Sequence, residues 1–216
     1  MIGQGVLREC LLDPEVGRVV TVGRTGTGVK HTKLREVVAN NLFDLTSLDA
    51  ELTGFDACFF CLGVSSSGVS EAEYERLTYT LTMAAAETLA RLNPQMTFIY
   101  VSGAGTDGSE QGRVMWARVK GRTENALMRL PFKAAYMFRI AAVLPLNGER
   151  SRTPLYNFFY ALTKPVAPLI RMAFPGYVLS TVQIGRAMIG VARSGAEKRV
   201  LESPDIRECA RKAGAR

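Results

Sequence analysis

Three glycine clusters in the chain have residue types that can bind nucleotide phosphates. Gly3 and Gly5 open an amphipathic helical pattern, which leads into a strand-like run that ends at Gly23. This order is typical of the second half of a strand–turn–helix–strand nucleotide-binding unit, in which the helix N-terminus faces the pyrophosphate. We therefore predict that Gly3 and Gly5 belong to a cofactor-binding turn.

The other two clusters fit that role less well. The sequence GAGTDG at 103–108 matches the dinucleotide fingerprint by letter, but Gly112 interrupts any helix that would begin at its third glycine. The sequence RTGTGVK at 24–30 leads into another strand-like run, so it offers no helix N-terminus to a phosphate. We interpret it as a flexible turn.

Arg24 is a candidate for choosing the cofactor. It directly follows the second strand of the predicted unit, where a carboxylate suits a free ribose 2′-hydroxyl and a guanidinium suits a 2′-phosphate. The position therefore predicts NADP, with NAD still possible. The alternative is that Arg24 is a solvated arginine at a strand end.

The arrangement of apolar runs predicts the fold class. Continuous apolar runs alternate with helical patterns, which is typical of strands buried on both faces of a parallel sheet with crossover helices. With 216 residues and 47% hydrophobic composition, we predict one α/β domain, 1–216, with a doubly wound, mostly parallel sheet and a small substrate-side or lid region at 145–195. We expect strands at 18–23, 34–39, 57–63, 96–102, 134–140 and 199–202, and helices at 2–12, 71–92, 112–130, 155–172 and 181–194.

Composition argues against several other classes. The four cysteines form no regular framework, and CFFC lies in an apolar run, so we expect free thiols in a cytoplasmic protein rather than a metal or redox site. The net charge of +7 is spread along the chain and interleaved with acids, which argues against a nucleic-acid interface. Lys164, Arg171 and four prolines interrupt the apolar stretch 154–179, so we predict no transmembrane helix; peripheral membrane contact there is the less favoured reading.

With this order of elements, YVSGAGTDG and VMWARVKG carry a family resemblance. The chain resembles the atypical and extended short-chain dehydrogenases, the NAD(P)-binding epimerase/dehydratase-like group, and most closely their small branch related to the human Tat-interacting tumour suppressor. In that family the first strand leads into a Gly-x-x-Gly-x-x-Gly turn, and MIGQG looks like the tail of it, with Gly3 as the last glycine. The resemblance implies that Met1 is an internal methionine and that roughly ten residues, an apolar strand and the first glycines, precede it.

The resemblance also implies roles for further residues. Asp44 and Leu45 in FDLTSL would contact adenine, and Leu62 and Gly63 in CLGVSSSG would lie against the cofactor. Ser102 stands where the family keeps its catalytic serine or threonine. Lys120 takes the place of the lysine in the family's Tyr-x-x-x-Lys motif, where it would hold the nicotinamide ribose.

The chain departs from that motif at Trp116, which stands where the tyrosine belongs. Four residues apart on a helix, Trp116 and Lys120 share one face, but an indole N–H donates a hydrogen bond without serving as a general acid near neutral pH. Alternatively, Trp116 simply packs against the active-site cleft. Tyr74, Tyr79 and Tyr100 are the local candidates for a substitute acid, and none is convincing.

Two functions follow from these residues. The first is an NADP-dependent oxidoreductase that acts on a small carbonyl or alcohol through Ser102 and Lys120. The second is a catalytically degenerate NADP(H)-binding or regulatory protein, which Trp116 favours. The sequence names no substrate, and it leaves a protein partner or homo-oligomer open.

Overall fold

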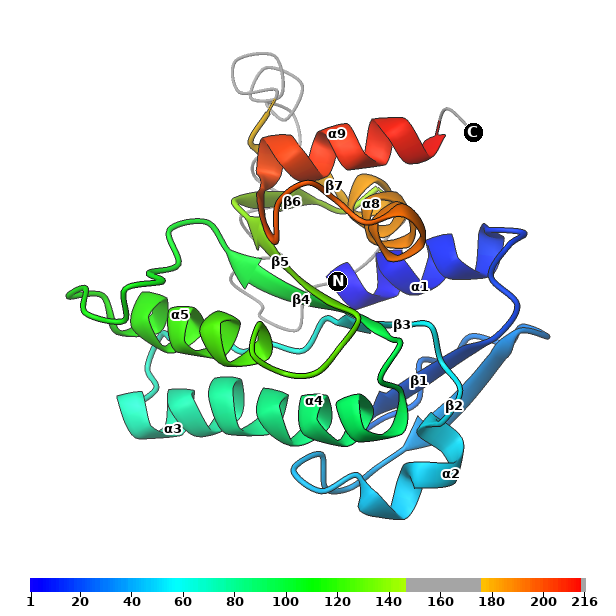
Figure 1. The fold of residues 1–216 in the computed structure, drawn as a ribbon, viewed down its shortest axis with the longest axis horizontal. Coiled ribbons are helices and arrows are strands. Elements are labelled where there is room, and N and C mark those ends of the chain that lie inside the picture. The colour runs from blue at the N-terminus through cyan, green and yellow to red at the C-terminus, as the bar shows by residue number, and fades with distance from the viewer. Residues whose placement is uncertain (147–175, 215–216) are drawn as a thin grey trace.

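The computed structural model describes residues 1–146 and 176–214, in which strands and helices alternate along most of the chain (Figure 1). The strands are β1 (Val19–Gly23), β2 (Leu34–Val38), β3 (Ala57–Phe60), β4 (Thr97–Gly103), β5 (Ala134–Ile140), β6 (Ala142–Leu144), β7 (Val178–Ser180) and β8 (Val200–Glu202). The helices are α1 (Ile2–Leu12), α2 (Asp49–Leu52), α3 (Glu71–Glu75), α4 (Leu81–Leu92), α5 (Met115–Leu127), α8 (Thr181–Ser194) and α9 (Ser203–Gly214).

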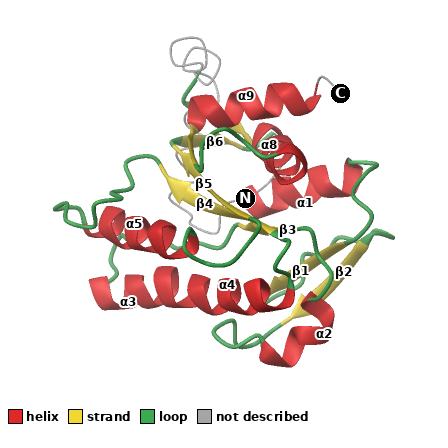
Figure 2. Cartoon of the chain, viewed as in Figure 1, coloured by secondary structure: helices red, strands yellow, loops and turns green. Residues whose placement is uncertain are grey.

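Every strand pairing among the described residues is parallel. β3, β4, β5 and β8 form a four-stranded sheet in that order, β1 pairs with β2, and β6 pairs with β7. Helices cover both faces, with α1, α8 and α9 on one side and α3, α4 and α5 on the other (Figure 2). The predicted doubly wound, parallel α/β fold is confirmed.

The parallel strands are interrupted between β1 and β3. Among the described residues, no strand pairs with both of them, and this is the place that the first strand takes in a dinucleotide-binding sheet. Side chains of β1 and β3 nevertheless pack against the same two apolar clusters. Val19 of β1 and Phe59 of β3 pack against the apolar cluster under α8 and α9, whereas Val22 and Phe60 belong to the cluster on the other face.

Helix α1 is held in place by α8. A Cβ atom at Gly5 would lie 2.5 Å from the Cβ of Thr181, and one at Gly185 would lie 2.7 Å from Cγ of Glu9. The two glycines therefore allow the helices to approach closely. A capping box between Ser180 and Gln183 defines the start of α8, so the point of contact with α1 is fixed.

Four expectations need correction. The strand expected at 57–63 ends at Phe60. The tail after Glu202 is helical, because Pro204 and Asp205 begin α9 and Ile206 and Ala210 bury one face of it. The helix at 71–92 contains one π-helical turn, Arg76–Thr80. The helix expected from 112 begins at Met115. The helix predicted at 155–172 and most of the lid region at 145–195 lie outside the described residues.

Candidate active site

The predicted site residues gather where the parallel strands end. Arg24 follows β1, Leu62 and Gly63 follow β3, and Ser102 lies near the end of β4. The carboxyl ends of parallel strands lie at one edge of a sheet, which is where open α/β folds bind ligands. The structure therefore brings residues far apart in sequence to one edge.

The N-terminus of α1 lies at this edge beside β3. A Cβ atom at Gly3 would lie 3.3 Å from the Cβ of Cys61, so a larger residue would push the helix away from the strand end. This is the close helix–strand contact that the last glycine of a dinucleotide-binding turn provides. Gly5 is arranged differently, because its N–H donates to the Met1 carbonyl at 3.2 Å and its Cα faces α8. The structure places Gly5 in the contact between α1 and α8.

The residues predicted to meet the nucleotide differ in exposure. Arg24 and Leu62 are exposed, and a Cβ atom at Gly63 would meet no atom within 4 Å. Asp44 is exposed, and hydrogen bonds from Thr46 hold the pKa of its carboxyl below the usual range. Leu45 is buried in the apolar cluster under α4, so its side chain is part of the core.

Ser102 takes part in a short chain of hydrogen bonds. The Thr106 hydroxyl donates to the Gly103 carbonyl at 2.7 Å, and the Ser102 and Thr106 hydroxyl oxygens lie 3.0 Å apart. A threonine hydroxyl has only one proton, so Ser102 must be the donor to Thr106 in this arrangement. The Ser102 oxygen is left with lone pairs that can accept a hydrogen bond.

The Trp116 ring packs over the turn that follows Ser102. Its six-membered ring lies 3.6 Å from the positions that Cβ atoms would take at Gly103 and at Gly105. Gly105 has φ +84°, a backbone conformation that favours glycine. Because neither glycine has a side chain, the indole can pack against the backbone there. Trp116 thus covers one side of the loop that carries Ser102.

Lys120 turns its ammonium group toward β4. Its Nζ lies 3.3 Å from the Tyr100 hydroxyl and 3.5 Å from the Val101 carbonyl, two residues and one residue before Ser102. Burial lowers the pKa of Lys120 to about 8, and the nearby Glu124 carboxylate opposes that shift. Burial also raises the pKa of Tyr100 above its ordinary value, so this tyrosine does not replace the missing acid.

The sequence reasoning missed Thr106, Glu124 and Arg139, which hold this site together. Thr106 fixes the Ser102 hydroxyl, as described above. Glu124 is 1% exposed and accepts hydrogen bonds from Arg139 at 2.6 and 3.1 Å, which ties α5 to β5. The only sequence signal for Glu124 is its position four residues after Lys120, on the same helix face.

The buried position of Lys120 is expected to make the stability of the protein depend on pH. Between about pH 8 and the ordinary lysine value of 10.5, the unfolded chain binds a proton that the folded chain has released, so this residue makes the free energy of unfolding rise with pH. In Lys120→Met that contribution is absent. From pH 7.5 to 10, urea unfolding should therefore shift in favour of the parent by about 1–3 kcal/mol relative to the variant. A difference that stays constant over this range would contradict the buried position of the ammonium.

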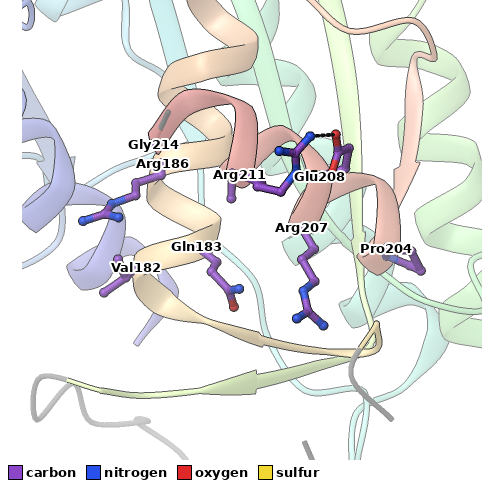
Figure 3. A pocket seen from close by; sticks show the side chains of 9 residues that line it. Val182, Gln183, Arg186, Pro204, Arg207, Glu208, Arg211 and Gly214 are labelled. Atoms are coloured by element: carbon purple, nitrogen blue, oxygen red, sulfur yellow. Dashed lines mark hydrogen bonds and ion pairs between the residues drawn. The ribbon is translucent and has the colours of Figure 1, made fainter. Parts of the chain in front are cut away.

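A separate groove of about 500 Å³ lies between α8 and α9 (Figure 3). Arg186, Arg207 and Arg211 line it, but Arg186 bonds to Glu9 and Arg211 bonds to Glu208. None of the predicted site residues contributes to its lining. The groove is thus a charged helix–helix boundary apart from the candidate site.

All four cysteines are free, and burial raises the pKa of the Cys58 and Cys61 thiols to about 12. Among residues 1–146 and 176–214, no group of three or more His, Cys, Asp or Glu side chains could hold a metal ion. No helix in these ranges is long and apolar enough to cross a bilayer.

Comparison with solved structures identifies the fold. The enzyme WbmF of Bordetella bronchiseptica, crystallised with NAD+, is 16% identical with TM-score 0.65, over 99% of this chain and 74% of that one. A short-chain dehydrogenase/reductase family oxidoreductase of Burkholderia thailandensis is 15% identical with TM-score 0.65, over 94% and 86%. The UDP-N-acetylglucosamine 4-epimerase of Bacillus cereus is 17% identical with TM-score 0.60, over 94% and 74%.

The chain shares its fold with these three solved enzymes. No protein-family model matches the chain, and no curated protein matches it. The short-chain-dehydrogenase-like fold expected from YVSGAGTDG and VMWARVKG is therefore confirmed, and identities of 15–17% speak to the fold alone. The roles of individual residues stay predictions.

Proposed function

We propose that the protein is an oxidoreductase of the short-chain dehydrogenase type, which binds NADP(H) and acts on a carbonyl or alcohol group of a small molecule. The observation that carries the proposal is the meeting of Ser102, Trp116 and Lys120 beside the carboxyl end of β4, at the same edge as the N-terminus of α1. The fold shared with an enzyme crystallised with NAD+ supports the choice of cofactor class. The free thiols keep a cytoplasmic location as the prediction.

The residues present fit a nicotinamide dinucleotide. Gly3 allows the first turn of α1 to approach β3, and a helix N-terminus favours the negative charge of a pyrophosphate. Arg24 would pair with a 2′-phosphate, and Leu62 and Gly63 would line the dinucleotide beside β3. NADP would supply the hydride acceptor, and NADPH the donor, for the reaction.

The protein's own residues would handle the substrate oxygen and its proton. The Ser102 oxygen, with its proton directed to Thr106, would accept a hydrogen bond from an alcohol. Lys120 would bind the nicotinamide ribose. Its pKa of about 8 is near enough to neutral pH for its ammonium group to exchange a proton with solvent. Solvent would deliver the proton that the family's tyrosine otherwise carries.

The second candidate function is binding without efficient catalysis. Trp116 supplies no ionisable group, and its ring is packed on Gly103 and Gly105. The Ser102 hydroxyl already donates its proton to a hydrogen bond with Thr106. A regulatory protein that holds NADP(H) and acts through a protein partner or a second copy would show these features.

Substitution of Trp116 distinguishes the two candidates. With NADPH and a panel of small aldehydes and ketones, the parent should turn over slowly, and Trp116→Tyr should raise the rate at least about tenfold because it restores an ionisable hydroxyl beside Lys120. Trp116→Phe is the matched control, since it makes the same space without the hydroxyl. Equal rates for the Tyr and Phe variants would favour the binding protein, and a fast parent would show that the tyrosine is dispensable.

A further inference from the structure

The groove between α8 and α9 holds a set of hydrogen-bond donors that the proposed function does not use (Figure 3). Gln183 and Arg186 line it from α8, and Arg207 and Arg211 line it from α9, while Glu208 supplies the carboxylate in its lining. Positive charge therefore predominates in this hollow. Its volume of about 500 Å³ is in the range of small-molecule sites. We call it the α8–α9 groove.

A buried carboxylate orients Arg186 beside the groove. Glu9 of α1 is 5% exposed, and a Cβ atom at Gly185 would lie 2.7 Å from its Cγ, so the glutamate side chain is packed tightly against α8. Its carboxylate accepts a hydrogen bond from Nε of Arg186 at 3.1 Å and also bonds to Arg8. The Arg186 guanidinium is therefore oriented before a ligand arrives, which lowers the entropic cost of binding.

Arg211 is held in the same manner by Glu208. The Glu208 carboxylate accepts from Nε of Arg211 at 2.8 Å and from Nη2 at 2.7 Å, and Nζ of Lys212 lies 3.9 Å from it. A guanidinium has five N–H donors. The bonds to Glu208 occupy two of them in Arg211, and the bond to Glu9 occupies one in Arg186. Both guanidiniums can therefore still donate to an anion.

The capping box of α8 adds a neutral donor to the same groove. The side-chain oxygen of Gln183 accepts from the Ser180 N–H at 2.9 Å, so the NH2 group of the same amide is left to donate elsewhere. Figure 3 shows the Gln183 and Arg207 side chains extending to the same side of the two helices. The donors of the groove therefore come from both of its walls.

Donors on two walls favour a phosphate over a carboxylate. A carboxylate is planar, and one guanidinium fork can satisfy both of its oxygens. A phosphate group instead presents oxygens in several directions, and a chain of phosphates can meet donors from both helices at once. The donors line a hollow of small-molecule size, which suits a soluble anion.

We propose that the α8–α9 groove binds a small soluble anion with two or more phosphate groups. Arg207 and Arg211 hold its phosphates from α9, while Arg186 and the Gln183 amide hold them from α8. This proposal does not rest on the proposed function, because the groove and the candidate active site share no residue within the part of the chain that the structure describes.

Calorimetric titration of the full chain with inorganic triphosphate, at constant ionic strength and without nucleotide, tests the proposal. Gln183→Glu keeps the oxygen of the capping box but replaces the NH2 group with a second, negatively charged oxygen. Its matched control is Gln95→Glu, which makes the same change in an exposed turn between α4 and β4. Arg211→Gln is compared with Arg76→Gln, because Arg76 bonds to Glu73 with the same spacing and through the same atoms.

We expect saturable binding of triphosphate by the parent. Gln183→Glu and Arg211→Gln should each weaken it at least about tenfold, and the two controls should change it less than about twofold. Arg211 is exposed, so its variant keeps the proposal testable even if Gln183→Glu fails to fold.

Three results would overturn the proposal. The parent could show no saturable binding, the groove variants could lose no more affinity than their controls, or a hexaglutamate peptide could bind more tightly than triphosphate. Both groove variants should keep the parent's affinity for NADPH. A failure of triphosphate binding would therefore leave the proposed oxidoreductase function untouched.

Discussion

Replacing Gly121 with alanine is expected to cost at least about 4 kcal/mol of stability or to prevent folding. A Cβ atom at this position would lie 1.7 Å from the carbonyl oxygen of Asp107 and 2.5 Å from its carbonyl carbon. Neither atom is the end of a flexible side chain. In an exposed helix the same change would stabilise by about 1 kcal/mol, so the two effects have opposite signs.

The loop around Asp107 cannot easily move away. The Asp107 N–H donates to the Ala117 carbonyl at 3.1 Å, and its carboxylate accepts from the Gly112 N–H at 2.6 Å. The contact docks α5, which carries Trp116 and Lys120, against the turn after Ser102. Urea unfolding should be compared with Gly17→Ala, where a Cβ would meet no atom within 4 Å and the change should stay within about 0.5 kcal/mol. Similar stabilities for the two variants would show that α5 does not dock in this way.

Removing the Glu124 carboxylate should have the second-largest effect. Glu124 is 1% exposed, and its partner Arg139 also lies 3.5 Å from Glu202. Removing one partner of a buried ion pair is strongly destabilising, and Arg139 would keep only its longer contact with the exposed Glu202, so Glu124→Ala is expected to lower the free energy of unfolding by about 3–5 kcal/mol. The measurement is urea unfolding at neutral pH.

An exposed ion pair between Glu73 and Arg76 provides the control. Glu73 bonds to Arg76 at 2.9 Å, but both side chains are well exposed, so Glu73→Ala should cost about 0–1 kcal/mol. The double variant Glu124→Leu with Arg139→Met should recover part of the loss, because it removes both charges. If Glu124→Ala costs no more than Glu73→Ala, the pair does not hold α5 to β5.

The main elements of the fold could be predicted from the sequence. β5 and α1 have the predicted bounds, because a continuous apolar run and a clear helical periodicity each report local structure. Helix α9 was missed because its exposed face carries many charges, and only Ser203, Ile206 and Ala210 of its residues are buried. The three-residue strands β6 and β7 were not predicted, although β8, which has the same length, was.

The site could be predicted only in part. Arg24 and Ser102 lie at strand ends, which local patterns locate well. By contrast, the role of Thr106 depends on its hydrogen bond with the Ser102 hydroxyl, and the role of Gly121 depends on the close approach of the Asp107 carbonyl. Such contacts depend on how α5 and the loop pack in three dimensions. For the same reason Leu45 and Gly5, predicted to meet the cofactor, lie in packed interiors.

A nucleotide titration tests the proposed cofactor site most directly. NADPH and NADH are titrated by calorimetry into the parent, into Arg24→Ala and into Arg129→Ala. The last variant is the control, because it removes an exposed arginine just beyond the C-terminal end of α5. We expect saturable binding in which the parent prefers NADPH by about 10–100-fold, since a hydrogen-bonded charge pair contributes about 1.5–3 kcal/mol. Arg24→Ala should lose that preference and Arg129→Ala should keep it. Equal affinities in the parent would contradict the role of Arg24, and the absence of saturable binding by either nucleotide would contradict the dinucleotide site itself.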